Sequence, residues 1–473
     1  MSVAIDRRPL SALLLHHSVP FAAVMVLAIV AWWMLGLEPA QGLTEPGWRA
    51  LIVFALCLIL WATQLFPLAV TSLLGLALIP LLGIMPAADS YSLFGNTAVF
   101  FILGALILAA GVIKTGLSEQ LALGILKKVG GGTKRLLLAV LILSACMAFF
   151  MPEHAVAAIF LPIILEVVRG LDLPKGHRYS ASLFFAMAWG TIIGGVATLL
   201  GGARGPLAIG ILEEITGEQI AFLDWTIAAA PLVFCMLAVA IVVLLCCIRG
   251  VDVNTTGASE RLRQRQLELG PLSSKGKWMA AVMLLTVAAW VFMGHAYGLA
   301  SIALAAVVAM FFLRLVSWHD VEEYVNWGIV LMYGGAIAIG KALSVTGAAV
   351  WVANSMLPAG ITSLALLAGL ALITLLLTET VSNVAAVAIL LPIAIPLGQA
   401  AGMDVVSITL AVAIVAGFAF MLPMGTPANA LIYSTGYVRL HRMIRRGAVM
   451  SFSVWCLFLL TAWFIWPLIG RGW

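Results

Sequence analysis

The sequence has very little charge for its length. Lys, Arg, Asp and Glu make up 10% of its 473 residues and 63% are hydrophobic, whereas about a quarter of an average soluble domain is charged. Apolar runs of about 20 residues recur along the whole chain, and a helix needs about that many to cross a bilayer. This composition excludes a soluble protein and predicts an all-α polytopic membrane protein with the lipid bilayer around it.

Cysteine is scarce as well, and common catalytic or metal-binding motifs are absent. The six cysteines all fall inside apolar segments, where we expect them to pack as small hydrophobic residues and not to form disulfides. The chain contains no His-Glu-x-x-His, no second histidine at ligand spacing and no Gly-x-Ser-x-Gly. We therefore expect no enzyme and no bound cofactor, and the net charge of +5 gives no reason to expect nucleic acid as a partner.

The positions of the basic residues predict which loops face the cytoplasm. Of the 25 Lys and Arg residues, 21 gather in six places, and assigning all six to the cytoplasm is consistent with eleven spans. The N-terminus then lies in the cytoplasm, in a multi-pass protein of the bacterial inner (plasma) membrane. The spans are predicted at 20–37, 50–66, 69–85, 98–114, 180–202, 226–248, 278–294, 299–314, 326–343, 405–424 and 448–470, and the basic places are 7–8, 114–135, 169–178, 249–277, 314 and 439–446.

Two further apolar stretches do not fit a simple crossing. Residues 136–168 lie between two basic places that are both assigned to the cytoplasm, so this segment has to leave and return on one side. As one helix it would be roughly 50 Å long, too long for one crossing and too short for two. We therefore predict a re-entrant hairpin that turns near Pro152, and a second one at 361–397, from the outer side, that turns near the sequence TVSN.

The chain contains two copies of one unit. PEHAVAAIFLPI (152–163) is similar to SNVAAVAILLPI (382–393), and other segments pair at nearly the same offset of about 230 residues. Each copy holds five spans and one hairpin, and an odd number of crossings inverts the second copy in the membrane. Such inverted-topology repeats are typical of secondary transporters, which bind substrate and coupling ions between the repeats. The predicted domains are 1–45 (N-terminal segment and first transmembrane helix), 46–249 (repeat 1), 250–276 (a solvated cytoplasmic linker) and 277–473 (repeat 2).

Two motifs of the second half resemble those of a known family of carriers. TETVSNVAAVAILLPI (378–393) and AFMLPMGTPANALIYSTGYV (419–438) are similar to the second-half signatures of the divalent anion–sodium symporter family, which carries dicarboxylates, citrate or sulfate. The resemblance runs from about residue 50 to the C-terminus. It implies sodium-coupled transport of a small anion by alternating access, a homodimer, and one sodium site wherever a hairpin tip faces the loop of a broken helix.

In the second half, the resemblance implies a sodium site made of oxygen atoms. Thr378 and Ser382 are spaced one helical turn apart, so both hydroxyls are expected to face one ion. Asn383 at the tip and a main-chain carbonyl at Gly425 complete this site. Val384 stands where the family has threonine, so one hydroxyl that would face the substrate is missing. The residues assigned to substrate binding in this half are Asn383, Val384, Thr426, Pro427 and Asn429.

In the first half, the corresponding positions hold charged and titratable residues. Glu153 replaces an asparagine, His154 replaces a threonine, and the loop GGARGP places Arg204 where the family has Gly-Thr-Pro-Pro-Asn. Our hypothesis is that Arg204 acts as a tethered cation in place of the first sodium, with Glu153 as its counter-ion, because unpaired charges inside the membrane are costly. Two alternatives stay open: Arg204 grips a carboxylate or sulfate group of the substrate, or it is a solvated loop arginine. We place all three residues at the substrate site.

Other mechanisms of coupling also stay open. Histidine titrates near neutral pH, so protonation of His154 or Glu153 would replace one sodium in a proton-coupled or exchange-type anion carrier. A neutral histidine that is hydrogen-bonded inside the hairpin fits equally well. Transporters of the arsenite or sodium–proton type share the plan of inverted hairpins. The anion itself is left open between di- or tricarboxylates and sulfate-like ions.

Overall fold

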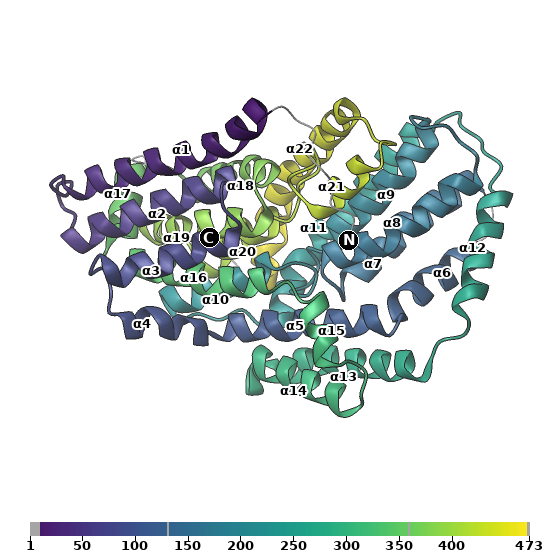
Figure 1. The fold of residues 1–473 in the computed structure, drawn as a ribbon, viewed down its shortest axis with the longest axis horizontal. Helices are drawn as coiled ribbons and strands as arrows, with labels where there is room; N and C mark the ends of the chain where they lie inside the picture. Colours follow the sequence, from purple (N-terminus) through teal and green to yellow (C-terminus); the bar gives the residue numbers. More distant parts are fainter. Residues whose placement is uncertain (1–9, 130–131, 358–359, 471–473) are drawn as a thin grey trace.

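The computed structural model describes residues 10–129, 132–357 and 360–470, and within these ranges it contains helices and no strand (Figure 1). Eight of the described helical stretches are long and apolar enough to cross a membrane. The chain is therefore a helical membrane protein, as its composition predicts. The eight stretches are Glu45–Thr63, Ala87–Lys114, Phe222–Cys247, Ser274–Tyr297, Trp327–Val345, Ser363–Thr380, Asn383–Ala400 and Leu440–Phe464.

After the N-terminal helix α1 (Leu10–Leu35), the helices follow a similar order in two halves of the chain. The first half consists of α2 (Glu45–Thr63), α3 (Leu68–Leu81), α4 (Ala87–Ser92), η1 (Leu93–Gly95), α5 (Thr97–Lys114), α6 (Leu117–Val129), α7 (Thr133–Ala148), α8 (Glu153–Gly170), α9 (Arg178–Gly194), α10 (Arg204–Thr216) and α11 (Phe222–Cys247). The second half consists of α13 (Ser274–Tyr297), α14 (Leu299–Phe312), α15 (Trp318–Tyr324), α16 (Trp327–Val345), α17 (Ala348–Met356), α18 (Ser363–Thr380), α19 (Asn383–Ala400), α20 (Val405–Val415), α21 (Pro427–Ser434), α22 (Leu440–Phe464) and η2 (Trp466–Ile469). Helices α2–α3, α5, α6, α7–α8, α9–α10 and α11 thus have counterparts in α13–α14, α16, α17, α18–α19, α20–α21 and α22. The inverted orientation of the second half stays a prediction.

All eleven predicted spans fall on helices, but two of them end eight and nine residues earlier than predicted, more than any of the others. Helix α9 ends at Gly194 and helix α20 ends at Val415. Irregular chain follows each of them, at 195–203 and at 416–426, before α10 and α21 begin. We call these segments the first and second broken stretch. The first contains three glycines, which are poor helix formers, and the second contains a proline, which cannot donate a helical hydrogen bond.

The two helical hairpins turn where the sequence predicts. Helix α8 begins directly after Pro152, and α19 begins directly after Ser382, whose hydroxyl caps it. Figure 1 shows α7–α8 and α18–α19 extending toward opposite ends of the long axis, with their turns near the middle. Helices α18 and α19 each have 18 residues, about 27 Å, which is also enough for a crossing. Entry and exit on the same side of the membrane therefore stays a prediction.

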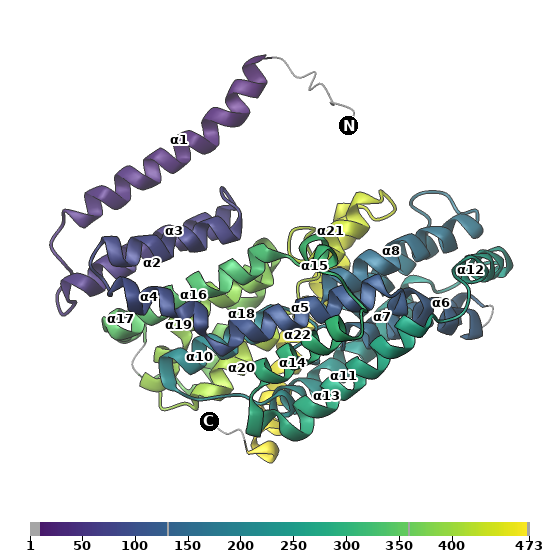
Figure 2. The same ribbon diagram turned by 60° about the horizontal axis from the view of Figure 1, so that its bottom comes forward.

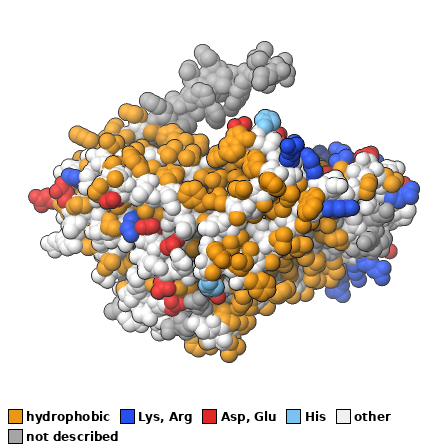
Figure 3. Space-filling view, turned by 90° about the horizontal axis from the view of Figure 1, so that it is seen from below, with side chains coloured by type: hydrophobic (Ala, Val, Ile, Leu, Met, Phe, Trp, Pro, Cys, Tyr) orange, Lys and Arg blue, Asp and Glu red, His pale blue; other side chains and the backbone are white. Residues whose placement is uncertain are grey.

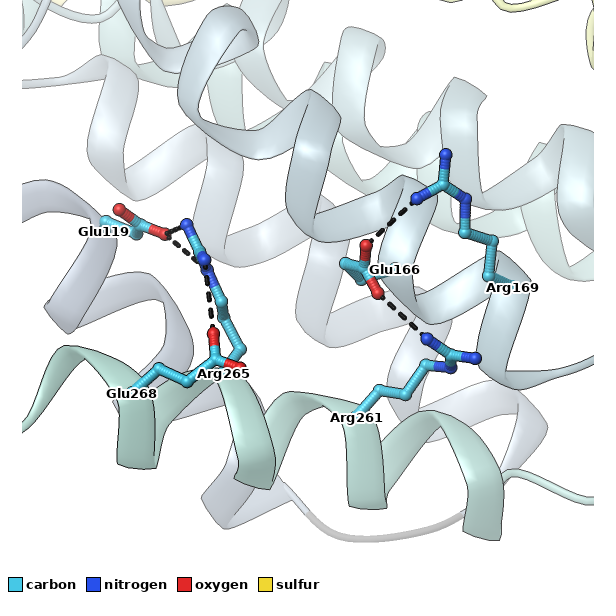
Figure 4. Close-up of polar contacts among 6 residues, drawn as sticks. All are labelled: Glu119, Glu166, Arg169, Arg261, Arg265 and Glu268. Atoms are coloured by element: carbon cyan, nitrogen blue, oxygen red, sulfur yellow. Dashed lines mark hydrogen bonds and ion pairs between the residues drawn. The ribbon is translucent and has the colours of Figure 1, made fainter.

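The linker between the halves carries a helix that packs on the first half, so it is more than the solvated connector that its polar sequence predicts. Helix α12 (Thr256–Leu269) lies against α8 and α6. A Cβ atom on Gly170 of α8 would lie only 2.7 Å from the carbonyl oxygen of Gly257, so the two backbones touch. Figure 4 shows the ion pairs that fasten α12, including Arg261 to Glu166 at 3.3 Å and Arg265 to Glu119 at 3.1 Å.

The short helix α15 is tied to α5 by a buried carboxylate. Asp320 forms a capping box with Ser317 and an ion pair of 2.6 Å with Lys114. Because Lys114 and Ser317 both hydrogen-bond to the ionised carboxylate, they hold the pKa of Asp320 well below its ordinary value.

The outer surface is largely apolar, as expected for a protein surrounded by lipid. In Figure 3 hydrophobic side chains spread over most of the visible face, while most Lys and Arg side chains lie toward the right-hand end. That end of the long axis contains α12 and one end each of α6 and α8, which the sequence assigns to the cytoplasm (Figure 1). Helix α1 leans away from the other helices (Figure 2), and its Met34 carbonyl accepts a hydrogen bond from Trp48 at 3.0 Å.

Candidate functional site

The tips of the two hairpins touch each other, which joins residues 230 positions apart in the chain. Asn383, the first residue of α19, donates from Nδ2 to Oε1 of Glu153, the first residue of α8, at 3.3 Å. Both side chains are buried, with 5% and 7% of their surface exposed. The N-terminal ends of α8 and α19 therefore meet, and the partial positive charge at such helix ends favours an anion close by.

Three oxygen atoms and the side-chain amide of Asn383 converge beside the tip of the second hairpin. The Thr378 hydroxyl donates to the carbonyl oxygen of Ala416 at 2.7 Å and lies 2.8 Å from the inward-facing atom of the Asn383 amide. The same amide atom lies 3.0 Å from the carbonyl oxygen of Gly425 and 3.3 Å from that of Ala416. These oxygens come from the hairpin on one side and from both ends of the second broken stretch on the other.

The Asn383 amide has two orientations with different consequences. With its oxygen inward, Nδ2 reaches Glu153, but the oxygen then lies against the carbonyl oxygens of Ala416 and Gly425, which cannot donate. With its nitrogen inward, the NH₂ group donates to these carbonyls and to the Thr378 hydroxyl. The first orientation needs a cation among the four oxygens, and hard cations are bound by oxygen ligands of this kind. The residues present therefore fit a sodium ion.

Ser382 is placed differently from what its spacing suggests. Helix α18 ends at Thr380 and Val381 is extended, so Thr378 and Ser382 do not lie one turn apart on one helix, and that expectation is wrong. The Ser382 hydroxyl instead accepts a hydrogen bond from the N–H of Ala385 at 3.2 Å. A sodium ligand role for Ser382 stays a prediction, whereas the carbonyl of Ala416 is an oxygen that sequence reasoning missed.

Glu379 is a buried carboxylate that sequence reasoning also missed, and it holds the second broken stretch in place. Its side chain is 4% exposed, and no basic side chain of the described residues forms an ion pair with it. The carboxylate accepts four hydrogen bonds, from the N–H groups of Phe420 (2.8 Å), Met421 (2.8 Å) and Leu422 (3.2 Å) and from the hydroxyl of Ser451 (2.8 Å). An acidic residue in the middle of a largely apolar hairpin is the sequence feature that could have identified Glu379, and the same feature identifies Glu153 in the first hairpin.

The predicted substrate residues of the second half shape and border the same stretch. Asn429 donates from Nδ2 to two of its carbonyl oxygens, at 3.0 and 3.2 Å, and its buried Oδ1 has no hydrogen-bond partner among the described residues. The hydroxyl of Thr426 caps α21 by accepting from the N–H of Asn429 at 3.2 Å. Pro427 opens α21 and is exposed, and Val384 is half-buried beside the tip.

Arg204 lies buried between the two broken stretches, with 2% of its surface exposed. Its Nη2 donates to the carbonyl oxygen of Gly195 at 2.8 Å, and its Nη1 lies 3.9 Å from Oε2 of Glu153. A side chain on Gly417, in the second broken stretch, would collide with the guanidinium. This burial excludes the solvated loop arginine that the sequence left open.

By the sequence repeat, the residues around the guanidinium correspond to residues of the oxygen cluster in the second half. The guanidinium is close to Glu153 and to Gly202, whose counterparts in the repeat are Asn383 and Gly425. The ion pair is loose, because Oε2 of Glu153 and Nε of Arg204 have no hydrogen-bond partner among the described residues.

His154 follows Glu153 at the tip of the first hairpin. It is half-buried and no hydrogen bond joins it to another described residue. The structure therefore brings His154 to the tip, but no hydrogen bond joins it to Arg204.

Comparisons with known proteins show which family and which solved structures the chain is similar to. The family model described as "Sodium:sulfate symporter transmembrane region" matches residues 17–471. The chain is 28% identical over 437 residues to a sodium-dependent dicarboxylate transporter of Staphylococcus saprophyticus, covering 86% of this chain and 84% of the relative. It is 26% identical over 455 residues to the protein of the same name from Staphylococcus aureus, covering 89% and 87%.

Two solved transporter structures are similar in fold. One is the YdaH transporter of Alcanivorax borkumensis, with a TM-score of 0.52, 12% identity and coverage of 81% of this chain and 87% of that one. The other is MtrF of Neisseria gonorrhoeae, with a TM-score of 0.57, 16% identity and coverage of 91% and 96%. At these identities the similarity concerns the fold alone.

Proposed function

Because the chain belongs to the family of the sodium:sulfate symporter transmembrane region, we propose that it carries a small anion, a di- or tricarboxylate or a sulfate-like ion, together with sodium by alternating access. Its curated relatives are named transporters, so it is a transporter and not an enzyme. The observation that carries the proposal is the contact of two hairpin tips beside the cluster of three oxygens and the Asn383 amide, which fits sodium. Family membership also favours this proposal over a transporter of the arsenite or sodium–proton type.

In this proposal a single sodium ion binds in the second half. Thr378, Asn383, Ala416 and Gly425 supply its oxygen ligands. The balance of buried charge near the tips supports one monovalent cation. Glu153 and Arg204 offset each other, whereas Glu379 has no basic partner among the described residues, so one added positive charge makes the region neutral.

In the first half, Arg204 serves as the tethered cation. Its guanidinium bonds to a main-chain carbonyl and lies near a carboxylate, the kinds of oxygen that would otherwise hold an ion. Direct grip on the substrate is less favoured because almost none of the Arg204 surface is exposed. Since the cation is covalently attached, it cannot be released with the substrate, and the sodium coupling falls by one ion.

The anion binds in this proposal where four helix ends meet. Helices α8, α10, α19 and α21 all begin at or beside the tips and broken stretches, and their N-terminal ends favour negative charge. His154, Val384 and Pro427 are the partly accessible residues among those assigned to the substrate. Two of them, His154 and Val384, replace threonines of the family. The choice between carboxylates and sulfate is therefore left to experiment.

The test is uptake by proteoliposomes across a panel of labelled anions, with sodium and proton gradients imposed separately. The proposal expects sodium-driven uptake of at least one di- or tricarboxylate or sulfate. Uptake that a proton gradient alone drives, with no response to sodium, contradicts it.

A second candidate mechanism couples the anion to protons or to exchange. It is favoured by the loose ion pair of Glu153, whose Oε2 has no hydrogen-bond partner among the described residues and is free to take up a proton. In that case His154→Gln changes the pH profile of transport, whereas an unchanged profile removes the proton role of His154.

We further expect a homodimer in the bacterial inner (plasma) membrane with a cytoplasmic N-terminus. The bacterial relatives and the basic end of the molecule support this location.

A further inference from the structure

Six basic side chains gather where α9, α11 and α22 end on the predicted cytoplasmic side, and we call them the basic cluster. Arg442 donates to the carbonyl oxygen of Gly176 at 3.0 Å, which ties α22 to the loop before α9. Lys175 of that loop lies 5.9 Å from the ring centroid of Tyr437, and the guanidinium of Arg446 lies 5.2 Å from that of Phe185. The members of the basic cluster are Lys175, Arg178, Arg439, Arg442, Arg445 and Arg446.

The basic cluster differs from the arginines of α12, because none of its members forms an ion pair with a described residue. No ion pair joins any of the six to a carboxylate of the described residues, and Asp172, in the same loop as Lys175, is exposed and forms none. On α12, by contrast, Arg261 and Arg265 (Figure 4), as well as Arg263, each have a carboxylate oxygen within 3.4 Å. The topology rule for basic residues explains why both groups face the cytoplasm, but not why one of them converges without counter-ions.

A second observation points to a ligand at the basic cluster. Nη1 of Arg446 is buried and has no hydrogen-bond partner among the described residues. Arg178, Arg442 and Arg445 are close enough to interact electrostatically with Arg446. An anion with acceptor oxygens would satisfy this donor and offset the like charges around it.

The surroundings of the basic cluster indicate what kind of anion this is. Just below it on α22, Val449 and Phe452 are 50% and 66% exposed, and on the adjoining α11 Val242 is 60% exposed. An apolar surface beneath a group of cations matches a phospholipid, with acyl chains along the helices and a phosphate at the arginines. We propose that the basic cluster binds the head group of an anionic phospholipid of the cytoplasmic leaflet.

The test uses the purified full-length protein in a neutral detergent, titrated with dioctanoylphosphatidylglycerol while its melting temperature is followed. The anionic lipid is expected to raise the melting temperature with a saturating midpoint, and dioctanoylphosphatidylcholine is not. Each cation near a membrane surface is worth about 1 kcal/mol toward anionic lipid, so removing one weakens binding roughly fivefold. Arg445→Gln/Arg446→Gln should therefore raise the midpoint about 25-fold.

The matched control is Arg261→Gln/Arg265→Gln, which removes the same charge from the paired residues of α12 and should leave the midpoint unchanged. Should the first variant fail to fold, Arg439→Gln/Arg445→Gln changes two exposed members and should shift the midpoint similarly. Equal binding of the two lipids, an equal shift in the control, or full displacement of the lipid by inorganic phosphate overturns the proposal. The result does not depend on which anion or coupling ion the protein carries.

Discussion

Replacing Glu379 by glutamine tests how the second broken stretch is held. The substitution keeps the shape of the side chain, but only one of its two terminal atoms can still accept. If the amide oxygen still accepts hydrogen bonds from the N–H groups of Met421 and Leu422, the NH₂ group faces the N–H of Phe420. This buried N–H is then left unpaired, at a cost of about 1–3 kcal/mol. The remaining bonds also weaken, because an ionised acceptor binds about twice as strongly as a neutral one. We estimate a total loss of about 2–4 kcal/mol.

This loss should appear in sodium affinity, because the stretch that Glu379 holds carries the carbonyls of Ala416 and Gly425. Each 1.4 kcal/mol transmitted to the site weakens binding about tenfold, so the half-saturating sodium concentration for uptake should rise at least tenfold. The control is Ser451→Ala, which removes the hydrogen bond of 2.8 Å from the Ser451 hydroxyl to Glu379 but leaves the charge of Glu379 and its three backbone donors. It should cost about 1 kcal/mol and shift the sodium dependence only a few-fold. A folded Glu379→Gln protein with unchanged sodium dependence would refute the reasoning.

Three further predictions follow from individual contacts. Thr378→Val removes one of the proposed sodium ligands and should raise the half-saturating sodium concentration about tenfold. The control is Thr374→Val, which loses only a hydroxyl bonded within α18 and should leave this concentration unchanged. Equal shifts in the two variants would contradict the site. Arg204→Gln leaves Glu153 buried without a cation and should destabilise the protein by about 3–5 kcal/mol. The double variant Glu153→Gln/Arg204→Gln should melt at a higher temperature than Arg204→Gln. A double variant that melts at a lower temperature would argue against the ion pair. Asp320→Asn should lower the melting temperature at neutral pH. Because the folded pKa of Asp320 is depressed, its stabilisation is present above the unfolded pKa of about 3.9 and is lost as the pH falls through the folded pKa. The difference in melting temperature between the two proteins should therefore shrink in acid, and a pH-independent difference would contradict this account.

The parts of the fold that local signals determine could be predicted from the sequence. The length of apolar runs predicted the helices, and Pro152 indicated the turn between α7 and α8 because proline interrupts a helix that runs into it. An ion pair between Glu153 and Arg204, which lie in two different apolar segments, is one of the hypotheses that the sequence supports, and the two side chains lie 3.9 Å apart.

The parts that depend on main-chain geometry could not be predicted in this way. The carbonyl of Ala416 joins the oxygen cluster only because α20 ends one residue earlier, and an alanine carries no sign of that in its side chain. The break at Val381 separates Thr378 from Ser382, so a spacing that assumed one continuous helix was misleading. The many charges of the linker predict a solvated segment, but two of them, Arg261 and Arg265, pair with carboxylates of α8 and α6.

The number of sodium ions moved with each anion tests the central claim most directly. Reversal potentials measured in proteoliposomes, at known gradients of sodium and of the transported anion, give this ratio without reference to any variant. A chain whose second half binds one ion, while Arg204 occupies the equivalent place in the first, should move one sodium per anion. A ratio of two or more would show that the first half also binds and releases a cation, and would contradict the account.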